Sequence, residues 1–254
     1  VVYLTFRPFQ KFDFLVCGFS TRLGGVSTGI YSSMNLSYQR GDLGEAVDEN
    51  YMRMCRALGV KPEQLVYSNQ VHGTRVAYID GSRTLYLETD GLITDQSDCI
   101  LTTSYADCVP LYFVDPVKKA VGLSHSGWRG TVGKIGAETV KQMREQFGCK
   151  SNDLIAVVGP SICKDCYEVS EDVAKAFMAH FQKEQVQNFL RQTDASHYQL
   201  DLWKANEFVL KDSGLLPENI HISGLCTCCN SKLLFSHRAT QGKRGNMNGF
   251  LGIH

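Results

Sequence analysis

The stretch between Cys108 and His125 constrains the fold more than any other part of the sequence. Residues 108–114 are apolar and β-prone, residues 115–118 place proline in the second turn position, and residues 120–125 are apolar again. This pattern predicts a β-hairpin. With the turn centred on the middle of residues 115–118, Cys108 lies directly opposite His125, where facing β-carbons are about 5 Å apart. The sequence therefore predicts a thiol and an imidazole meeting at the open end of one hairpin.

A third residue, His72, extends this pair to a set with the composition of a metal site. It precedes Gly73 at a break between two expected strands, where sheet proteins tend to place reactive groups. Two histidines and one cysteine match the ligand count of a catalytic zinc, and they also match a blue-copper centre. A metal-free dyad, with Cys108 as nucleophile and His125 as base, is the third possibility, and it does not require His72.

Composition favours an enzyme that acts on small molecules. The 254 residues fit one large α/β domain, expected to span 1–254, and 26 basic residues balance 26 acidic ones. Neutral charge argues against a nucleic-acid or membrane-surface partner. The sequence has no apolar run of membrane-spanning length and its first residues do not resemble a signal peptide, so we expect a cytoplasmic protein with reduced cysteines. Monomer and small homo-oligomer both remain open.

Expected helices alternate with expected strands along the chain. Apolar spacing predicts helices near 47–58, 130–147, 173–181 behind an N-cap at Ser170, and 202–209 capped by Asp201. Residues 154–158 and 220–225 have the composition of buried strands. The alternation predicts an α/β fold.

Two Gly-rich segments are candidates for substrate binding. Residues 24–37 are expected to form an ordered substrate loop beside Arg22, our first candidate for phosphate recognition. Residues 127–130 lead into an expected helix, whose backbone N–H groups, together with Arg129, suit an anion. The alternative for the second segment is a corner that only allows close packing of strand and helix.

Five motifs, in order along the chain, resemble the YfiH-type laccase-domain family of purine nucleoside phosphorylases, once catalogued as polyphenol oxidases. The motifs are Gly18-Phe-Ser-Thr-Arg-Leu-Gly-Gly-Val-Ser27, Asn69-Gln-Val-His-Gly73, Ala106-Asp-Cys-Val-Pro110, Ser124-His-Ser-Gly-Trp-Arg-Gly130 and Gly224-Leu-Cys-Thr-Cys-Cys229. Two departures, the serines at 124 and 126 and the segment Cys163-Lys-Asp-Cys166, spare the three ligand candidates.

The resemblance implies an α/β sandwich of mixed sheets flanked by helices, and a zinc held by His72, Cys108 and His125. It also implies phosphorolysis of adenosine, inosine, guanosine and methylthioadenosine, and hydrolytic deamination of adenosine. Phosphate and purine nucleosides are then the partners. Asp107 is a candidate proton carrier in deamination. The candidate substrate-binding residues are Arg22, Asn35, Arg129 and Gly130.

Copper oxidation of phenols is the main rival to this function. A multicopper oxidase needs about ten histidines, commonly in His-x-His pairs, because imidazole is the preferred copper ligand. The chain has seven histidines and no His-x-His. We therefore favour zinc, with copper at the same three residues as the alternative.

Five further cysteines raise the question of a second metal site. Cys163 and Cys166 are spaced like half of a zinc knuckle, and Cys226, Cys228 and Cys229 are candidates for the other half. The second set does not match the internal spacing of a standard zinc ribbon. We therefore expect ordinary thiols here in preference to a structural zinc.

Overall fold

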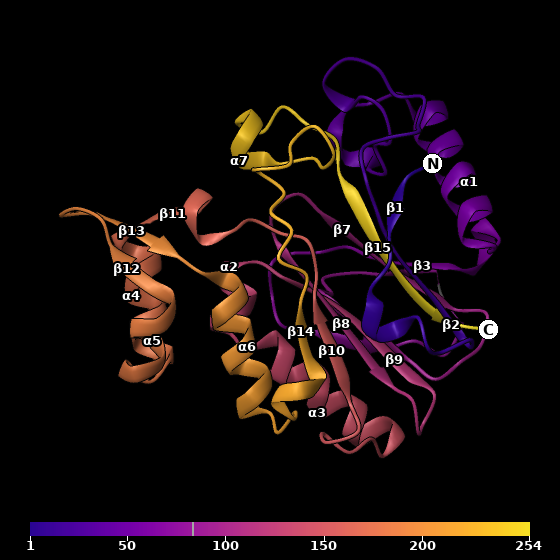
Figure 1. The fold of residues 1–254 in the computed structure, drawn as a ribbon. Helices are drawn as coiled ribbons and strands as arrows, with labels where there is room; N and C mark the ends of the chain where they lie inside the picture. The colour runs from indigo at the N-terminus through magenta and orange to yellow at the C-terminus, as the bar shows by residue number, and fades with distance from the viewer. Residues whose placement is uncertain (83) are drawn as a thin grey trace.

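The computed structural model describes residues 1–82 and 84–254, and it contains two six-stranded mixed sheets and one small sheet (Figure 1). In hydrogen-bonding order, the first sheet comprises β1 (Tyr3–Leu4), β2 (Leu15–Ser20), β15 (Met247–Ile253), β7 (Ile100–Tyr105), β3 (Leu65–Ser68) and β5 (Leu85–Tyr86). The second comprises β14 (Ile220–Ile222), β10 (Ile155–Val158), β8 (Val109–Asp115), β9 (Ala120–Ser126), β6 (Gly91–Thr94) and β4 (Val76–Tyr78). The third comprises β11 (Glu168–Ser170), β13 (His197–Leu200) and β12 (Leu190–Gln192).

Helices occupy the outer faces of these sheets. The α-helices are α1 (Gly44–Leu58), α2 (Trp128–Val132), α3 (Ile135–Phe147), α4 (Glu171–His180), α5 (Lys183–Phe189), α6 (Leu202–Asp212) and α7 (His237–Thr240). Short 3₁₀ helices are η1 (Arg7–Phe9), η2 (Gly29–Tyr31), η3 (Tyr38–Arg40), η4 (Pro62–Gln64), η5 (Lys164–Cys166) and η6 (Pro217–Asn219). Figure 1 shows α1 on one side of the molecule and α3 and α6 on the other.

Three buried apolar clusters separate these layers. One cluster lies between the two large sheets and contains Phe19 and Leu251 of the first sheet with Leu123 of the second. A second joins the second sheet to the helices α3 to α6, and the third joins α1 to the outer face of the first sheet. The predicted α/β sandwich of mixed sheets flanked by helices is thereby confirmed, in the layer order helix, sheet, sheet, helix.

Strand β8 shows how the sequence sets these layers. Val109, Leu111 and Phe113 join the cluster on the helix side, whereas Tyr112 and Val114 join the cluster between the sheets. Successive strand residues point to opposite faces, so a strand buried on both faces must be apolar throughout. The continuous apolar run of the hairpin therefore places it inside the sandwich.

The predicted hairpin forms, but its register differs from the expected one. Strands β8 and β9 pair from Asp115 with Ala120 to Val109 with Ser126. Pro110 faces His125, so Cys108 lies two positions beyond the residue that faces His125. The loop that joins the two strands is longer than the turn with two central residues that the prediction assumed. Because the shift is an even number of positions, Cys108 and His125 still point to the same face of the sheet.

Most predicted elements are present with different boundaries. Helix α6 begins where predicted, and the Asp201 side chain accepts a hydrogen bond from the Lys204 N–H at 3.0 Å. The helix predicted over 130–147 is instead two helices, because Lys134 adopts a left-handed φ of 60° between α2 and α3. Strand β14 is not the buried strand predicted, because it forms an edge of its sheet and leaves Ile222 40% exposed.

None of the helices over the described residues combines the length and the apolar character needed to cross a membrane.

Candidate metal centre and substrate cavity

The structure brings His72, Cys108 and His125 together at one end of the space between the two large sheets. Their ligand atoms lie within 4.8 Å of one another, and Cys108 Sγ is 3.8 Å from His72 Nε2. The two imidazole rings meet edge to face with centroids 4.8 Å apart. His125 lies in β9, Cys108 directly precedes β8, and His72 lies in the loop between β3 and β4. The three residues fit a single metal ion, since soft thiolate and imidazole donors both suit zinc and copper.

Asp90 organises two of these three donors, and the sequence reading missed it. Its fully buried carboxylate accepts a hydrogen bond from His125 Nδ1 at 2.8 Å, which leaves Nε2 as the free ring nitrogen. The same carboxylate accepts backbone N–H groups of Val71, His72 and Gly73 at 2.8–3.1 Å. A carboxylate behind a histidine fixes the tautomer and orientation of a metal ligand. The position of Asp90, directly before the apolar strand β6, was the available signal.

Tight backbone geometry completes the centre. His72 has a φ of 61°, which the three hydrogen bonds from its loop to Asp90 stabilise. A β-carbon on Gly127 would lie 2.9 Å from His72 Cδ2 and 3.2 Å from Cys108 Sγ. Only glycine fits there without displacing a donor. The Gly-rich corner after β9 therefore serves close approach to the centre.

The centre concentrates negative charge. Burial raises the pKa of the Cys108 thiol, but the charge of His125 and hydrogen bonds from both imidazoles outweigh burial and place the pKa below its usual range. Burial disfavours the charged imidazole of His125, yet the Cys108 thiolate and Asp90 raise its pKa above the ordinary value. The Cys108 thiolate and the Asp90 carboxylate thus favour positive charge at His125, and a metal bound at this centre would replace the proton on its ring nitrogen.

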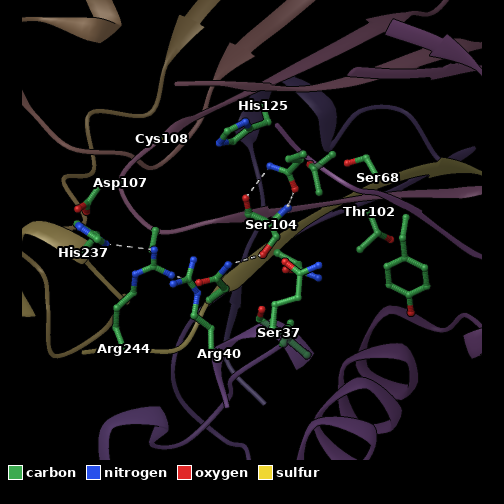
Figure 2. A pocket seen from close by; sticks show the side chains of 18 of the residues that line it. Ser37, Arg40, Ser68, Thr102, Ser104, Asp107, Cys108, His125, His237 and Arg244 are labelled. Carbon is green, nitrogen blue, oxygen red and sulfur yellow. Dashed lines mark hydrogen bonds between the residues drawn. The ribbon is translucent and has the colours of Figure 1, made fainter. Parts of the chain in front are cut away.

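A cavity of about 740 Å³ opens in front of the centre and falls in the size range of small-molecule sites. All three donors line it, together with Asp107 and aromatic side chains such as Tyr67. Figure 2 shows His125 on one side of the pocket and Arg40 and Arg244 on the other. The cavity therefore joins the centre to a second, cationic region.

Some residues that line this cavity carry buried polar atoms without hydrogen-bond partners. In the part of the chain that the structure describes, five buried side-chain polar atoms have no hydrogen-bond partner. Three of these, Ser68 Oγ, Arg244 Nε and Asn248 Oδ1, belong to residues that line the cavity. Unpaired buried polar groups are costly, and a ligand that supplies the missing partners explains them.

The cationic region consists of Arg244, Arg40 and His237. Arg244 is 7% exposed, and burial followed by repulsion from Arg40 lowers its pKa to about 10. Its guanidinium contacts the Asn246 side chain and lies 3.5 Å from His237 Nδ1. Arg40 is exposed and has no carboxylate partner among residues 1–82 and 84–254. Neither guanidinium forms an ion pair with a carboxylate among the described residues, and two arginines that line one cavity favour an anion.

Arg22 lies outside the lining of this cavity. Its Nε and Nη1 donate to the carbonyl oxygens of Ser32 and Ser231 at 2.9 and 2.8 Å, and the guanidinium stacks 4.6 Å from the Phe235 ring. These contacts tie the Gly-rich loop to a distant segment. Arg22 therefore donates to backbone carbonyl groups in this structure, and its expected role in phosphate recognition stays a prediction.

The other expected substrate-binding residues also lie outside the lining of the cavity. Asn35 is fully buried, and its side-chain oxygen accepts the backbone N–H groups of Ser37 and Asn246, which do line the cavity. Arg129 is exposed and stacks on Trp128 at 4.3 Å. Gly130 is buried against the carbonyl oxygen of Gly73. None of these three residues is among those that line the cavity.

Asp107 lines the cavity beside Cys108 and is firmly held. One carboxylate oxygen accepts a hydrogen bond from Thr227 Oγ1 at 2.6 Å and the other accepts the backbone N–H of Arg238 at 2.7 Å. Its backbone adopts a φ of 90°. A non-glycine residue in this region requires support from its surroundings, which these two bonds provide.

Comparison with known proteins finds a matching family and related enzymes. Residues 16–254 match the family described as multi-copper polyphenol oxidoreductase laccase. The chain is 39% identical over 248 residues to purine nucleoside phosphorylase YlmD of Bacillus subtilis, an alignment covering 94% of this chain and 88% of that protein. It is 36% identical over 261 residues to adenosine deaminase RL5 from an unknown prokaryotic organism, covering 96% and 98% of the two chains.

Solved structures agree with the fold. The crystal structure of the hypothetical protein YfiH from Bacillus licheniformis superimposes with a TM-score of 0.94 at 32% identity, covering 99% of this chain and 96% of that one. YlmD from Geobacillus stearothermophilus gives a TM-score of 0.92 at 33% identity, covering 96% and 94%. With the profile match over most of its length, the chain belongs to the YfiH-type laccase-domain family.

Proposed function

We propose that this chain is a zinc-dependent purine nucleoside enzyme. It cleaves adenosine, inosine, guanosine and methylthioadenosine by phosphorolysis, and it deaminates adenosine hydrolytically. The observation that carries the proposal is the single cavity that has a three-donor centre at one side and the Arg40–Arg244 pair at the other. Relatives named purine nucleoside phosphorylase and adenosine deaminase support the same chemistry.

The donor set fits zinc. His125 presents Nε2 because Asp90 occupies Nδ1, and the lowered pKa of Cys108 favours the thiolate that a metal requires. Three protein donors leave one position for a reactant, as in catalytic zinc sites. Bound zinc would supply a Lewis acid that polarises a reactant oxygen or nitrogen.

For phosphorolysis, the cationic region holds the nucleophile. A phosphate oxygen attacks C1′ of the ribose, the bond from C1′ to the purine nitrogen breaks, and the base leaves with the electron pair and takes up a proton. Arg244 and Arg40 neutralise the phosphate dianion and orient it across the cavity, where charge-assisted hydrogen bonds are strong. Ser68 and Asn248 offer unpaired polar atoms for the nucleoside.

For deamination, water adds to C6 of adenine, a proton passes to the departing amino group, and ammonia leaves. Asp107 is the candidate proton carrier because its carboxylate lines the cavity next to Cys108. Its existing bonds from Thr227 and Arg238 keep the carboxylate in place for this step.

A chromatographic assay tests the proposal. Purified protein with adenosine and phosphate should release adenine and ribose 1-phosphate, with slower formation of inosine that does not depend on phosphate. Phosphate-dependent base release should also occur from inosine, guanosine and methylthioadenosine. Failure to release base from every one of these nucleosides would refute phosphorolysis.

The same preparation tests the copper alternative. The family description names a copper oxidoreductase, but the chain has seven histidines, and the described residues contain one histidine-bearing metal cluster. Robust oxidation of a phenol by copper-loaded protein, without nucleoside turnover, would favour that alternative over ours.

A further inference from the structure

Four cysteines from two distant segments form a second cluster, separate from the first centre. Cys163 precedes η5 and Cys166 ends it, in the segment after β10, and Cys226 and Cys229 lie in the segment after β14. Their sulfur atoms all lie within 4.8 Å of one another. Cys229 Sγ is 3.4 Å from Cys166 Sγ and 3.9 Å from Cys163 Sγ. All four thiols are free.

These separations are close to those that a single tetrahedral ion imposes. With four sulfurs at about 2.3 Å from zinc, neighbouring sulfurs are about 3.8 Å apart. A disulfide joins only two sulfurs, at about 2.05 Å, and it does not account for four sulfurs gathered together. The arrangement therefore resembles a closed metal site with all positions filled by protein.

The structure also explains why the spacing of the cysteines at 226–229 argued against zinc in the sequence analysis. Cys228 does not belong to the mutually close set, so the second pair is Cys226 and Cys229. Each pair then has two intervening residues, which is the spacing of a zinc knuckle. The sequence-based preference for ordinary thiols treated the three cysteines at 226–229 as one set.

The backbone is arranged to receive a thiolate at the most buried sulfur. Cys226 is 5% exposed, and its sulfur accepts the N–H groups of Cys163 at 3.3 Å and Cys229 at 3.4 Å. Paired N–H donors on a ligand sulfur favour the anionic form and fix its direction. One of these donors comes from each knuckle, so the two segments share the same sulfur.

We propose that Cys163, Cys166, Cys226 and Cys229 bind a structural zinc ion that fastens together the two loops behind the substrate cavity. Tetrahedral sites with four sulfurs suit zinc or iron, and two knuckles of this spacing are typical of zinc.

The two loops contact the active cavity directly. Thr227, between the pair Cys226 and Cys229, donates to Asp107, and Ile162, beside Cys163, donates its N–H to the Asp107 carbonyl at 3.0 Å. Tyr167, next to Cys166, lines the cavity. A metal that fixes these loops therefore fixes Asp107 and its neighbour Cys108.

Elemental analysis separates this site from the first centre. Protein produced with added zinc and purified under reducing conditions should contain about two zinc ions per chain. The double variant His72→Ala/Cys108→Ala should retain about one, and Cys163→Ser should also retain about one. Zinc-free His72→Ala/Cys108→Ala, or Cys163→Ser with the full zinc content, would overturn the proposal, as would iron in place of zinc.

Cys228→Ser is the matched control, because it removes a neighbouring thiol that lies outside the set of four. It should retain the zinc content of the unmodified protein, and loss of one equivalent would contradict the ligand set. If Cys163→Ser does not fold, cobalt added to His72→Ala/Cys108→Ala provides the test. Four thiolates should give intense sulfur-to-cobalt absorption, and its absence would refute the site.

Thiol alkylation without reductant tests the disulfide alternative. The denatured His72→Ala/Cys108→Ala protein, stripped of metal by the denaturant and a chelator, should have all its remaining cysteines alkylated. If Cys166 and Cys229 reproducibly remain unalkylated, these two cysteines form a disulfide, and the proposal of a metal site is wrong.

Discussion

The two cysteine-containing clusters differ in what surrounds their sulfur atoms. At the first, one thiol and two imidazoles face a cavity, and Asp90 holds His125 and the backbone of His72 from behind. At the second, four thiols face one another, and backbone N–H groups replace the carboxylate. Three donors leave room for a reactant, whereas four donors close the coordination shell. The surroundings of the cysteines therefore distinguish a cluster that can bind a reactant from a cluster that holds two loops together.

The largest expected difference between the clusters is the effect of losing one donor on turnover. His72→Ala should lower kcat/KM for phosphorolysis at least about a hundredfold, because Lewis-acid stabilisation of a transition state is worth several kcal/mol. Steady-state kinetics, with circular dichroism to confirm folding, measure this. Near-normal activity would instead favour a metal-free dyad of Cys108 and His125.

Asp90→Asn should have the next largest effect. The amide keeps the size of the carboxylate but removes its charge, so orientation and basicity of His125 both suffer. Loss of such a supporting carboxylate typically lowers metal affinity or activity by about 10- to 100-fold. Zinc competition with a chromophoric chelator should show weaker binding at the first centre only. Weaker binding at the four-cysteine cluster would mean that the two clusters are not independent.

Arg244→Ala should raise the KM for phosphate about tenfold and leave phosphate-independent deamination of adenosine largely unchanged. The removed charge-assisted hydrogen bond is worth about 1.5 kcal/mol or more, and Arg40 retains part of the attraction. Arg22→Ala is the matched control, since Arg22 has the same charge but binds backbone carbonyls. If Arg22→Ala raises the phosphate KM and Arg244→Ala does not, the anion site has been placed wrongly.

Cys163→Ser should have the smallest effect on activity, a decrease in kcat/KM of less than about tenfold. The three donors of the first centre remain, and the loops lose only part of their hold on Asp107 and its neighbour Cys108. Small displacements of a catalytic group are costly but leave the chemistry possible. Complete inactivation, with the first-centre zinc retained, would show that the second cluster takes part in the reaction itself.

The structure brings together the three residues that the sequence proposed as donors, whereas the groups that support them were not predicted. Cys108 and His125 were paired correctly by face, although the hairpin register was shifted by two positions, because alternation along strands is set by local pattern. Asp90 was missed because its role depends on a contact across 35 residues of sequence. Such long-range partners leave no periodic trace in a single sequence.

The anion site shows the same limit. Arg22 lies in a Gly-rich loop and has the local character of a binding residue, yet distant carbonyl groups occupy its donors. No local sequence pattern marked Arg244 as an anion-binding residue. Its suitability for an anion comes from its burial beside Arg40 without an ion-pair partner in the described part of the chain. In the sequence alone, the spacing of the cysteines disfavoured a zinc at the second cluster. Only the structure shows that Cys229 belongs to the set of four and Cys228 does not.

The position of β15 has a consequence for how the protein acquires activity. This strand pairs with β2 on one side and β7 on the other, and Asn246 and Asn248 at its start line the cavity. One of the two partners of β2 therefore lies more than two hundred residues away in sequence, and pairings at such separations slow folding. During synthesis, the N-terminal strands remain an unfinished sheet until residues 247–253 emerge. Catalytic competence and completion of the first sheet should thus arise in the same late step.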